Sequence, residues 1–234
     1  MFRSLALARR TGRRLAPIVF AIIAGVTLAG RTNDEAAAMV GGAPPVASGI
    51  GRSVVLILGS YRSSSTACTA TAIGRDLLLT AAHCVQPGAD YKLVASETGD
   101  APVLKDVARI EREPQFDLKR LFDHLATADV ALIKLAEPVP ARIPPVRIGS
   151  EAETVTVGDT LVVVGYGDTV RGDGRTGGTV RAASLVVTGQ PGTLQIRLVD
   201  PATRGASAGL GACTGDSGAP AFREPPAASP SSAW

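Results

Sequence analysis

Short apolar runs, separated by clusters of glycine, proline, aspartate and serine, follow one another along the chain from Val40 onward. The runs are rich in Val, Leu, Ile and Thr, and no segment carries the sustained 3.6-residue apolar stripe with caps that a long helix requires. Regularly spaced short runs of this kind are typical of an all-β sandwich or barrel. The predicted strands cover residues 53–58, 68–73, 77–80, 91–95, 107–111, 130–135, 154–165, 179–188 and 194–199.

Two proline-containing segments divide and end this β pattern. Residues 141–150 (ARIPPVRIGS) contain two prolines, which lack the N–H group that a central strand donates. This segment is therefore the predicted boundary between two β halves, the first over about residues 39–140 and the second over about 141–222. Residues 223–234 (REPPAASPSSAW) are rich in Pro, Ala and Ser and are predicted to form a disordered tail.

The first thirty residues follow a different pattern. Residues 1–14 contain five arginines and no acid, and residues 15–30 form an uncharged apolar run of sixteen. A membrane-spanning helix needs about 20 apolar residues, so this run is short for an anchor and suits the core of a signal peptide. Small residues at 28–30 and 36–38 offer cleavage points. We predict a signal peptide over residues 1–30 and a short propeptide over 31–38, with an uncleaved signal anchor as the alternative.

Composition and charge narrow the class of protein. The chain has 234 residues, of which 45% are hydrophobic and 19% charged, which is enough to form a core in one domain or two small subdomains and excludes a disordered chain. The formal net charge is +3, and removing the five leader arginines leaves −2. The positive charge therefore belongs to the leader, and nucleic acid is not an expected partner.

The predicted leader also bears on the cysteines. An exported chain, secreted or periplasmic, meets a membrane only through its leader before cleavage, and it enters a compartment where disulfides persist. The chain contains three cysteines, Cys68, Cys84 and Cys213. Because three is an odd number, one thiol is expected to remain unpaired.

Three residues with the chemistry for nucleophilic catalysis lie in constrained settings. His83, one of only two histidines, directly follows an apolar strand in LTAAHC, and Asp129 directly precedes the apolar run VALIKL. Ser217 lies between small residues in CTGDSGAP, where a sharp turn would leave its hydroxyl accessible. A serine becomes a good nucleophile when an imidazole accepts its proton, and a carboxylate orients that imidazole. Each residue alone has a structural explanation, but together they meet this requirement.

Two other features have structural explanations. His124 matches no motif and is expected on a surface loop. The glycine-rich residues 165–178 lack the Lys-Ser/Thr pair of a phosphate-binding loop and have too few acids for a calcium site, so they are interpreted as a strand end and a loop. We expect no metal ion or organic cofactor.

The segments LTAAHC, DVALIKL and GDSGAP together resemble the chymotrypsin/trypsin-like serine protease family. The spacing of 46 residues from His83 to Asp129 and 88 from Asp129 to Ser217 is compatible with that family's chain order, and the likeness runs from about Met39 to Pro220. The resemblance implies two antiparallel six-stranded β-barrels with the active site between them.

The resemblance also implies catalytic roles. Ser217 would be the nucleophile, His83 the general base and then the general acid, and Asp129 the residue that orients His83. The backbone N–H groups of Gly215 and Ser217 would form the oxyanion hole, at about 3 kcal/mol for each donor. Protein or peptide substrates are the expected partners.

Further roles follow from the same resemblance. Cys68 and Cys84 would form a disulfide beside the catalytic histidine. The segment MVGG at residues 39–42 is similar to the activation site, where cleavage frees an α-amine, here on Met39 in place of the usual Ile or Val, that pairs with Asp216. Gly211 would form the floor of the specificity pocket; because it carries no charge, small or apolar side chains are the expected substrates.

The chain departs from the family at its C-terminus. Only fourteen residues follow Pro220, whereas family members continue for several dozen that supply two strands, a helix and the disulfide partner of Cys213. We therefore expect an incomplete second barrel, low stability and weak or no activity. The leading hypothesis is a secreted serine endopeptidase activated near Met39, and the alternative is a truncated, protease-like protein that acts by binding. An esterase is disfavoured because the strand–turn–helix arrangement of Gly-x-Ser-x-Gly is missing.

Overall fold

The computed structural model describes residues 39–46, 49–95, 103–150 and 153–223, all within one compact unit of residues 34–234. The predicted signal peptide and propeptide, and the tail after Arg223, lie outside the described residues.

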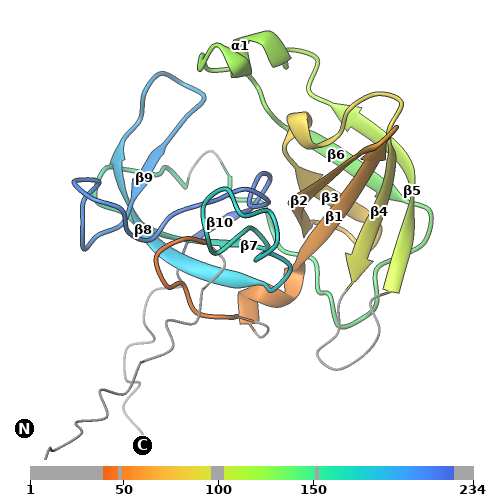
Figure 1. Ribbon diagram of the computed structural model, residues 1–234, viewed down its shortest axis with the longest axis horizontal. Coiled ribbons are helices and arrows are strands. Elements are labelled where there is room, and N and C mark those ends of the chain that lie inside the picture. The colour runs from red at the N-terminus through yellow and green to blue at the C-terminus, as the bar shows by residue number, and fades with distance from the viewer. Residues whose placement is uncertain (1–38, 47–48, 96–102, 151–152, 224–234) are drawn as a thin grey trace, which may run out of the picture. The chain divides into compact units, whose positions relative to one another are not determined.

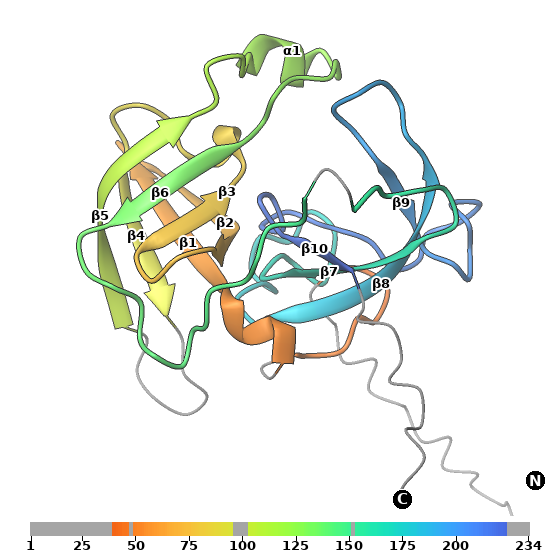
Figure 2. The same ribbon diagram turned by 180° about the vertical axis from the view of Figure 1, so that it is seen from behind.

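The first half of this part forms a closed barrel of six antiparallel strands in the order β1-β2-β3-β6-β5-β4 (Figures 1 and 2). The burial pattern of β6 alternates strictly, with Ala131, Ile133 and Leu135 inside, as expected for a strand with one face on a core. The strands are β1 (Val54–Tyr61), β2 (Ser64–Ala72), β3 (Leu77–Thr80), β4 (Asp90–Ala95), β5 (Val103–Arg112) and β6 (Ala131–Leu135).

Three short helical segments accompany the strands. Two are 3₁₀ turns, η1 (Gly49–Ser53) before β1 and η2 (Ala82–Cys84) after β3. The third is α1 (Leu118–Phe122), in which the Asp117 side chain accepts hydrogen bonds from the backbone N–H groups of the second and third helical residues. The sequence pattern missed α1 because a five-residue helix is too short to show a period of 3.6.

The second half forms an open four-stranded sheet in the order β10-β7-β8-β9. Its strands are β7 (Thr160–Gly165), β8 (Arg181–Gly189), β9 (Arg197–Val199) and β10 (Ala221–Arg223). Strand β7 is buried on both faces: Val163 packs in a cluster with Met39, and Val162 and Val164 pack in a cluster with Val54 of β1. This sheet therefore lies against the first barrel on one side.

Several predicted boundaries need correction. Strands β2 and β5 begin four residues earlier than predicted, and β9 begins three residues later. The strand predicted over 154–165 begins only at Thr160, because the Asp159 carboxylate accepts from the backbone N–H of Thr156 and closes a turn there. Arg223, assigned to the tail, lies in β10, where it pairs with Leu161 of β7. Among the described residues no strand lies between β6 and β7, so residues 141–150 lie in the connection between the barrel and the sheet.

Candidate active site

The barrel brings His83 and Asp129 together through two neighbouring strands. His83 lies in η2 directly after β3, and Asp129 lies two residues before β6, which pairs with β3. The Asp129 carboxylate accepts two hydrogen bonds from His83, one from the ring Nδ1 at 2.6 Å and one from the backbone N–H at 2.8 Å. The two contacts hold both the position of the residue and the orientation of its ring.

The environment of Asp129 favours its charged form. Burial by itself would raise the pKa of the carboxyl group, but the hydrogen bonds from the His83 ring and backbone outweigh it, and the pKa is lowered. An ionised carboxylate can only accept, so a neutral His83 ring carries its proton on Nδ1 and has a free lone pair on Nε2. This is the tautomer that a general base requires.

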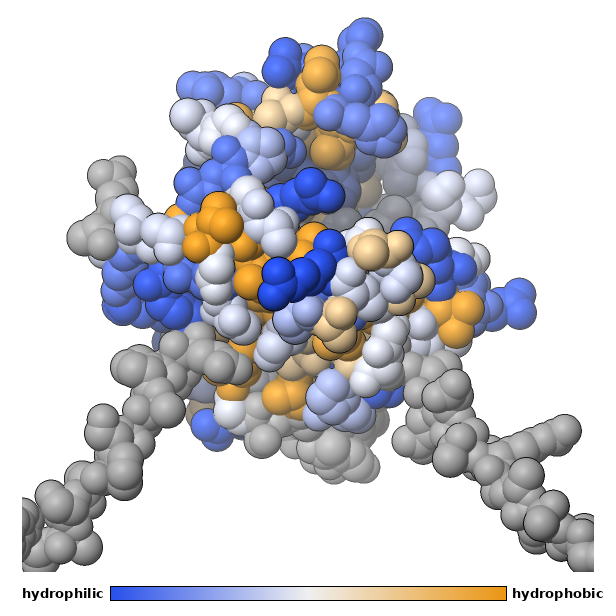
Figure 3. All heavy atoms as spheres, turned by 90° about the vertical axis from the view of Figure 1, so that its left-hand side faces the viewer, coloured by the Kyte–Doolittle hydropathy of each residue, from blue (hydrophilic) through white to orange (hydrophobic). Residues whose placement is uncertain are grey.

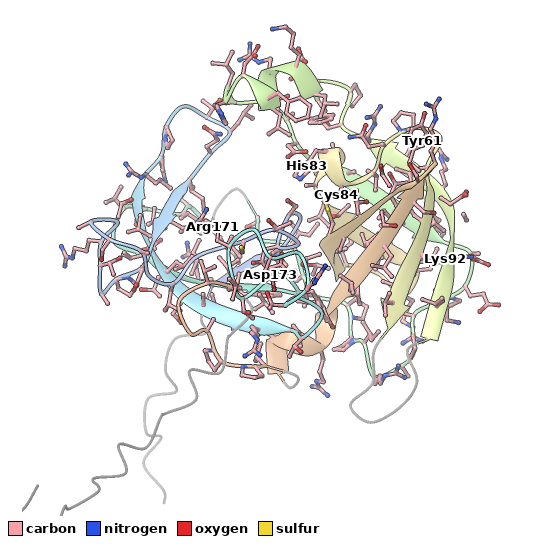
Figure 4. The ribbon with its side chains drawn as sticks, in the orientation of Figure 1. Tyr61, His83, Cys84, Lys92, Arg171 and Asp173 are labelled. Atoms are coloured by element: carbon pink, nitrogen blue, oxygen red, sulfur yellow. A yellow bond between two sulfur atoms is a disulfide. The ribbon has the colours of Figure 1, made fainter. Side chains whose placement is uncertain are left out.

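A disulfide between Cys68 of β2 and Cys84 of η2 lies beside this pair. The Cys84 Sγ atom is 3.8 Å from His83 Nε2 and 3.6 Å from the Ser217 carbonyl oxygen. A disulfide sulfur has no proton to donate, so these distances describe contacts and not hydrogen bonds from the sulfur. His83 and the Ser217 backbone both contact the same sulfur atom. Figure 4 shows His83 and Cys84 on the side of the first barrel that faces the second sheet.

Ser217 is partly exposed in the turn that precedes β10. Its carbonyl oxygen accepts a hydrogen bond of 2.8 Å from the backbone N–H of Thr69 on β2, across the joint between the barrel and the sheet. Within the described part of the chain its hydroxyl forms no hydrogen bond, to His83 Nε2 or to any other group. In structures without substrate, such contacts between a nucleophile and its base are commonly long.

Asp216, next to this serine, is a buried carboxylate. Its two oxygens accept hydrogen bonds of 2.8 Å from the backbone N–H groups of Gly167 and Cys213. Burial raises the pKa of the Asp216 carboxyl, and the nearby carboxylate of Asp168 adds to the increase, against the two N–H groups that lower it. No cationic side chain of the described residues forms an ion pair with it, so its charge is uncompensated by any side chain there.

The segment around Met39 packs against the same region. Met39 is fully buried, with Val163 and Leu185 as neighbours in its cluster. The next residue, Val40, forms an antiparallel bridge with Gly211, whose N–H donates to the Val40 carbonyl at 3.2 Å. The N-terminal end of the described chain is therefore paired with the segment that leads to Ser217.

The remaining candidates have structural roles or none at the site. Cys213 is a free, partly exposed thiol, and His124 is exposed after α1. Asp168, in the glycine-rich segment, accepts from two backbone N–H groups of its own loop at 2.9 and 3.0 Å, which agrees with the structural interpretation of that segment. The atoms of Cys68, His83 and Cys84 cluster within 4.8 Å, but both sulfurs are in the disulfide, so no thiolate is available for a metal ion.

A cavity of about 560 Å³ lies beside Asp129. It is lined by α1, by the segment leading into β6 and by residues just before β9, among them Leu121, Leu125, Val130 and Leu194. Figure 3, which views the β9 side, shows apolar side chains scattered among polar ones, with the surface set back beneath α1.

The fold and these segments match one family. The family model described as Trypsin matches residues 40–228. The chain belongs to the trypsin family. As in that family, the architecture is mostly β, with a closed six-stranded barrel and a second sheet. Membership supports a serine-protease type of function, with peptides or proteins as substrates.

Solved structures show the same fold. Human heparin binding protein has a TM-score of 0.62 and 19% sequence identity to this trypsin-family chain, over 79% of this chain and 81% of that one. An atomic-resolution structure titled HBP gives 0.61 and 18%, over 78% and 80%. No curated protein sequence matches this trypsin-family chain. In the part of the chain that the structure describes, no helix is long and apolar enough to cross a membrane.

Sequence reasoning missed one group of contacts around Ser217. Thr69, directly after Cys68, forms four hydrogen bonds, three across the joint between the barrel and the sheet and one with Thr80 at the end of β3. The only sequence signal is its position next to a cysteine of the predicted disulfide. A threonine in a strand is otherwise unremarkable, so its partners could not be named before the fold was known.

Proposed function

We propose that this trypsin-family chain is a serine endopeptidase that cleaves peptide bonds through an acyl-enzyme on Ser217. The observation that carries the proposal is the Asp129 carboxylate bound to both N–H groups of His83, with the Ser217 backbone in contact with the adjacent disulfide. This arrangement supports His83 as a base of the correct tautomer that acts on the partly exposed Ser217.

The reaction would proceed in two acyl-transfer steps. His83 Nε2 accepts the proton of the Ser217 hydroxyl as the oxygen attacks the substrate carbonyl carbon, and the negative charge develops on the carbonyl oxygen. The N–H groups of Gly215 and Ser217 stabilise that charge, at about 3 kcal/mol for each donor. His83 then gives its proton to the leaving amine, and water repeats the sequence to release the acid.

Activation would follow export and cleavage before Met39. The freed α-amine would pair with Asp216, a role that its uncompensated, buried carboxylate supports. The pairing is supported by the burial of Met39 and by the bridge from Val40 to Gly211, which lies in the segment that leads to Ser217. Because Gly211 carries no charge, we expect substrates with small or apolar side chains at the cleavage site.

A protease-like protein that only binds peptides is the second candidate. This candidate is favoured by one observation: among the described residues, the Ser217 hydroxyl makes no hydrogen bond to His83. The two candidates differ in one chemical property, the reactivity of Ser217.

Labelling with a serine-directed fluorophosphonate separates the two candidates. The full chain, exported and processed by its host, is compared with Ser217→Ala and His83→Ala, and with His124→Ala as the control for loss of an exposed histidine. We expect labelling of the parent and the control, none of Ser217→Ala, and a rate at least about a thousandfold lower for His83→Ala. Folded parent protein that does not react would contradict the endopeptidase proposal and favour the binding protein.

A further inference from the structure

Thr69 is a fully buried residue of β2 whose polar atoms all point across the joint to the second sheet or to the end of β3. Its backbone N–H donates to the Ser217 carbonyl at 2.8 Å, and its hydroxyl donates to the Gly215 carbonyl at 2.8 Å. The same hydroxyl accepts from the backbone N–H of Tyr166 at 3.0 Å, and the Thr69 carbonyl accepts from the Thr80 hydroxyl at 2.8 Å. Every hydrogen-bonding group of this residue therefore has a partner.

The position of Thr69 on the strand explains this set of contacts. Cys68, Ala70 and Ala72 belong to the core of the first barrel. Since side chains alternate along a strand, Thr69 points to the opposite face, toward the second sheet. Thr71 shares that face and is also buried, but its hydroxyl has no hydrogen-bond partner. The contacts are therefore specific to position 69 and are not a general property of buried threonines on this strand.

We infer that Thr69 is a positioning residue for the oxyanion hole, because it holds the peptides that directly follow Gly215 and Ser217, each adjacent to a peptide that carries a donor N–H group. This inference deepens the proposed function and rests on it. The carbonyls that Thr69 binds belong to Gly215 and Ser217, the two residues whose N–H groups would contact the oxyanion. Gly215 has a φ of +93° and no Cβ to restrict its backbone, so an external contact is needed to hold the orientation of its peptide groups.

The hydroxyl and the backbone of Thr69 fix different parts of the turn. The hydroxyl fixes the peptide after Gly215, and the backbone N–H fixes the peptide after Ser217. The peptide before Gly215 is held separately, because the Thr214 carbonyl accepts from the Asp168 N–H at 2.7 Å. The N–H of the peptide after Gly215 belongs to Asp216 and donates to the Cys213 carbonyl at 3.0 Å. Loss of the hydroxyl therefore releases the carbonyl end of that peptide only, so the turn should lose its alignment while the fold is kept.

Three substitutions separate positioning from packing. Thr69→Val keeps the shape but removes the hydroxyl, leaving the Gly215 carbonyl and the Tyr166 N–H buried without a partner. Thr69→Ser restores the hydroxyl. Thr71→Val makes the same chemical change two residues away, where the hydroxyl has no partner, and serves as the matched control.

The first measurement is the rate of fluorophosphonate labelling, followed by kcat and KM on a peptide substrate. We expect Thr69→Val to label about 10- to 100-fold more slowly, with the loss in kcat and little change in KM, because a misplaced donor acts only in the transition state. Thr69→Ser should restore most of the lost rate, and Thr71→Val should match the parent. A Thr69→Val protein that labels at the parent rate would overturn the inference.

The second measurement does not depend on activity. The Tyr166 N–H donates to the Thr69 hydroxyl itself, and the Asp216 N–H belongs to the peptide whose carbonyl the hydroxyl binds, although it donates to the Cys213 carbonyl. Amide hydrogen exchange should therefore be at least about tenfold faster for Tyr166, and faster for Asp216, in Thr69→Val than in Thr71→Val. If the parent fails to label, the proposed function fails, and equal exchange in the two variants would then overturn the positioning role as well. Should Thr69→Val fail to fold, Thr69→Ser and Thr69→Ala give the same comparison, since they differ only in the hydroxyl.

Discussion

Replacing Gly218 by alanine tests the close approach between the Ser217 turn and the first barrel. Gly218 has a φ of +81°, and a Cβ built there would lie 2.2 Å from the Thr80 hydroxyl and 2.3 Å from the Thr69 carbonyl oxygen. Both atoms belong to the hydrogen bond that joins the two threonines. The methyl group cannot be accommodated unless the turn moves away from β2 and β3.

The loss of stability expected for Gly218→Ala has two parts, backbone strain and weakened hydrogen bonds, which can be measured separately. The left-handed backbone costs a non-glycine residue about 1–2 kcal/mol. Displacing the turn also weakens the Thr80–Thr69 bond and the bond from the Thr69 N–H to the Ser217 carbonyl, at about 0.5–1.5 kcal/mol each. Gly218→Ala should therefore lower the free energy of unfolding by about 2–5 kcal/mol, which is a large share of the total of about 5–15 kcal/mol that is typical of a folded domain.

Gly172→Ala is the matched control. Gly172 has a similar φ of +79° in an exposed loop, but no atom lies within 4 Å of a Cβ built there. Urea unfolding with linear extrapolation should show a loss of about 1–2 kcal/mol for Gly172→Ala and a larger loss for Gly218→Ala. Fluorophosphonate labelling should slow only for Gly218→Ala. Equal losses of stability and equal labelling in the two variants would refute the close approach of Gly218 to Thr69 and Thr80.

Three further predictions concern the disulfide and the two site carboxylates. Replacing Cys68 and Cys84 together by alanine should lower the free energy of unfolding by about 3 kcal/mol, as expected for a closed loop of this length, whereas Cys213→Ser should leave it unchanged; equal urea midpoints would contradict this. The pKa of Asp129 is lowered in the folded state, so the carboxylate should stabilise the fold relative to Asp129→Asn by a constant amount above the unfolded pKa near 3.8. This stabilisation should be lost only as the pH falls through the lower, folded pKa, which urea titrations at several pH values can follow. The pKa of Asp216 is raised, so its effect on stability has the opposite dependence on pH: the stabilisation is complete below pH 3.8 and is lost as the pH rises through the raised, folded pKa. Asp216→Asn should therefore flatten the pH dependence of the free energy of unfolding of the full, uncleaved chain. An unchanged slope would show that the carboxyl titrates normally.

The first barrel was predictable from local patterns. Its strands are runs such as 131–135, where alternate apolar residues lie inside, and turn residues separate each run from the next. The resemblance in LTAAHC and DVALIKL also identified a pair, His83 and Asp129, that the barrel then places in contact, because β3 and β6 are neighbours. The strand pattern and the two segments could be recognised because each depends on a few consecutive residues.

The second half was less predictable for physical reasons. Strand β10 has only three residues, and its pairing with β7 depends on a partner about sixty residues earlier in the chain. The second barrel, for which the resemblance implies six strands and the departure at the C-terminus predicts fewer, is represented within the described residues by an open four-stranded sheet. Nothing in the local pattern of residues 154–165 shows that the turn at Asp159 delays the start of β7.

The joint between the barrel and the sheet was beyond sequence reasoning because of the kind of contact that forms it. Thr69 meets Tyr166 and Gly215 across separations of 97 and 146 residues, through a hydroxyl and backbone groups that leave no hydrophobic period in the sequence. The chemistry of a triad protease therefore depends on two kinds of feature in the sequence. The identities of His83, Asp129 and Ser217 stand in short segments, whereas the alignment of the turn that holds Ser217 depends on buried polar contacts between distant segments. A protein that kept all three identities and lost the hydroxyl at position 69 would still resemble the family, and its rate of acylation is the property that would reveal the difference.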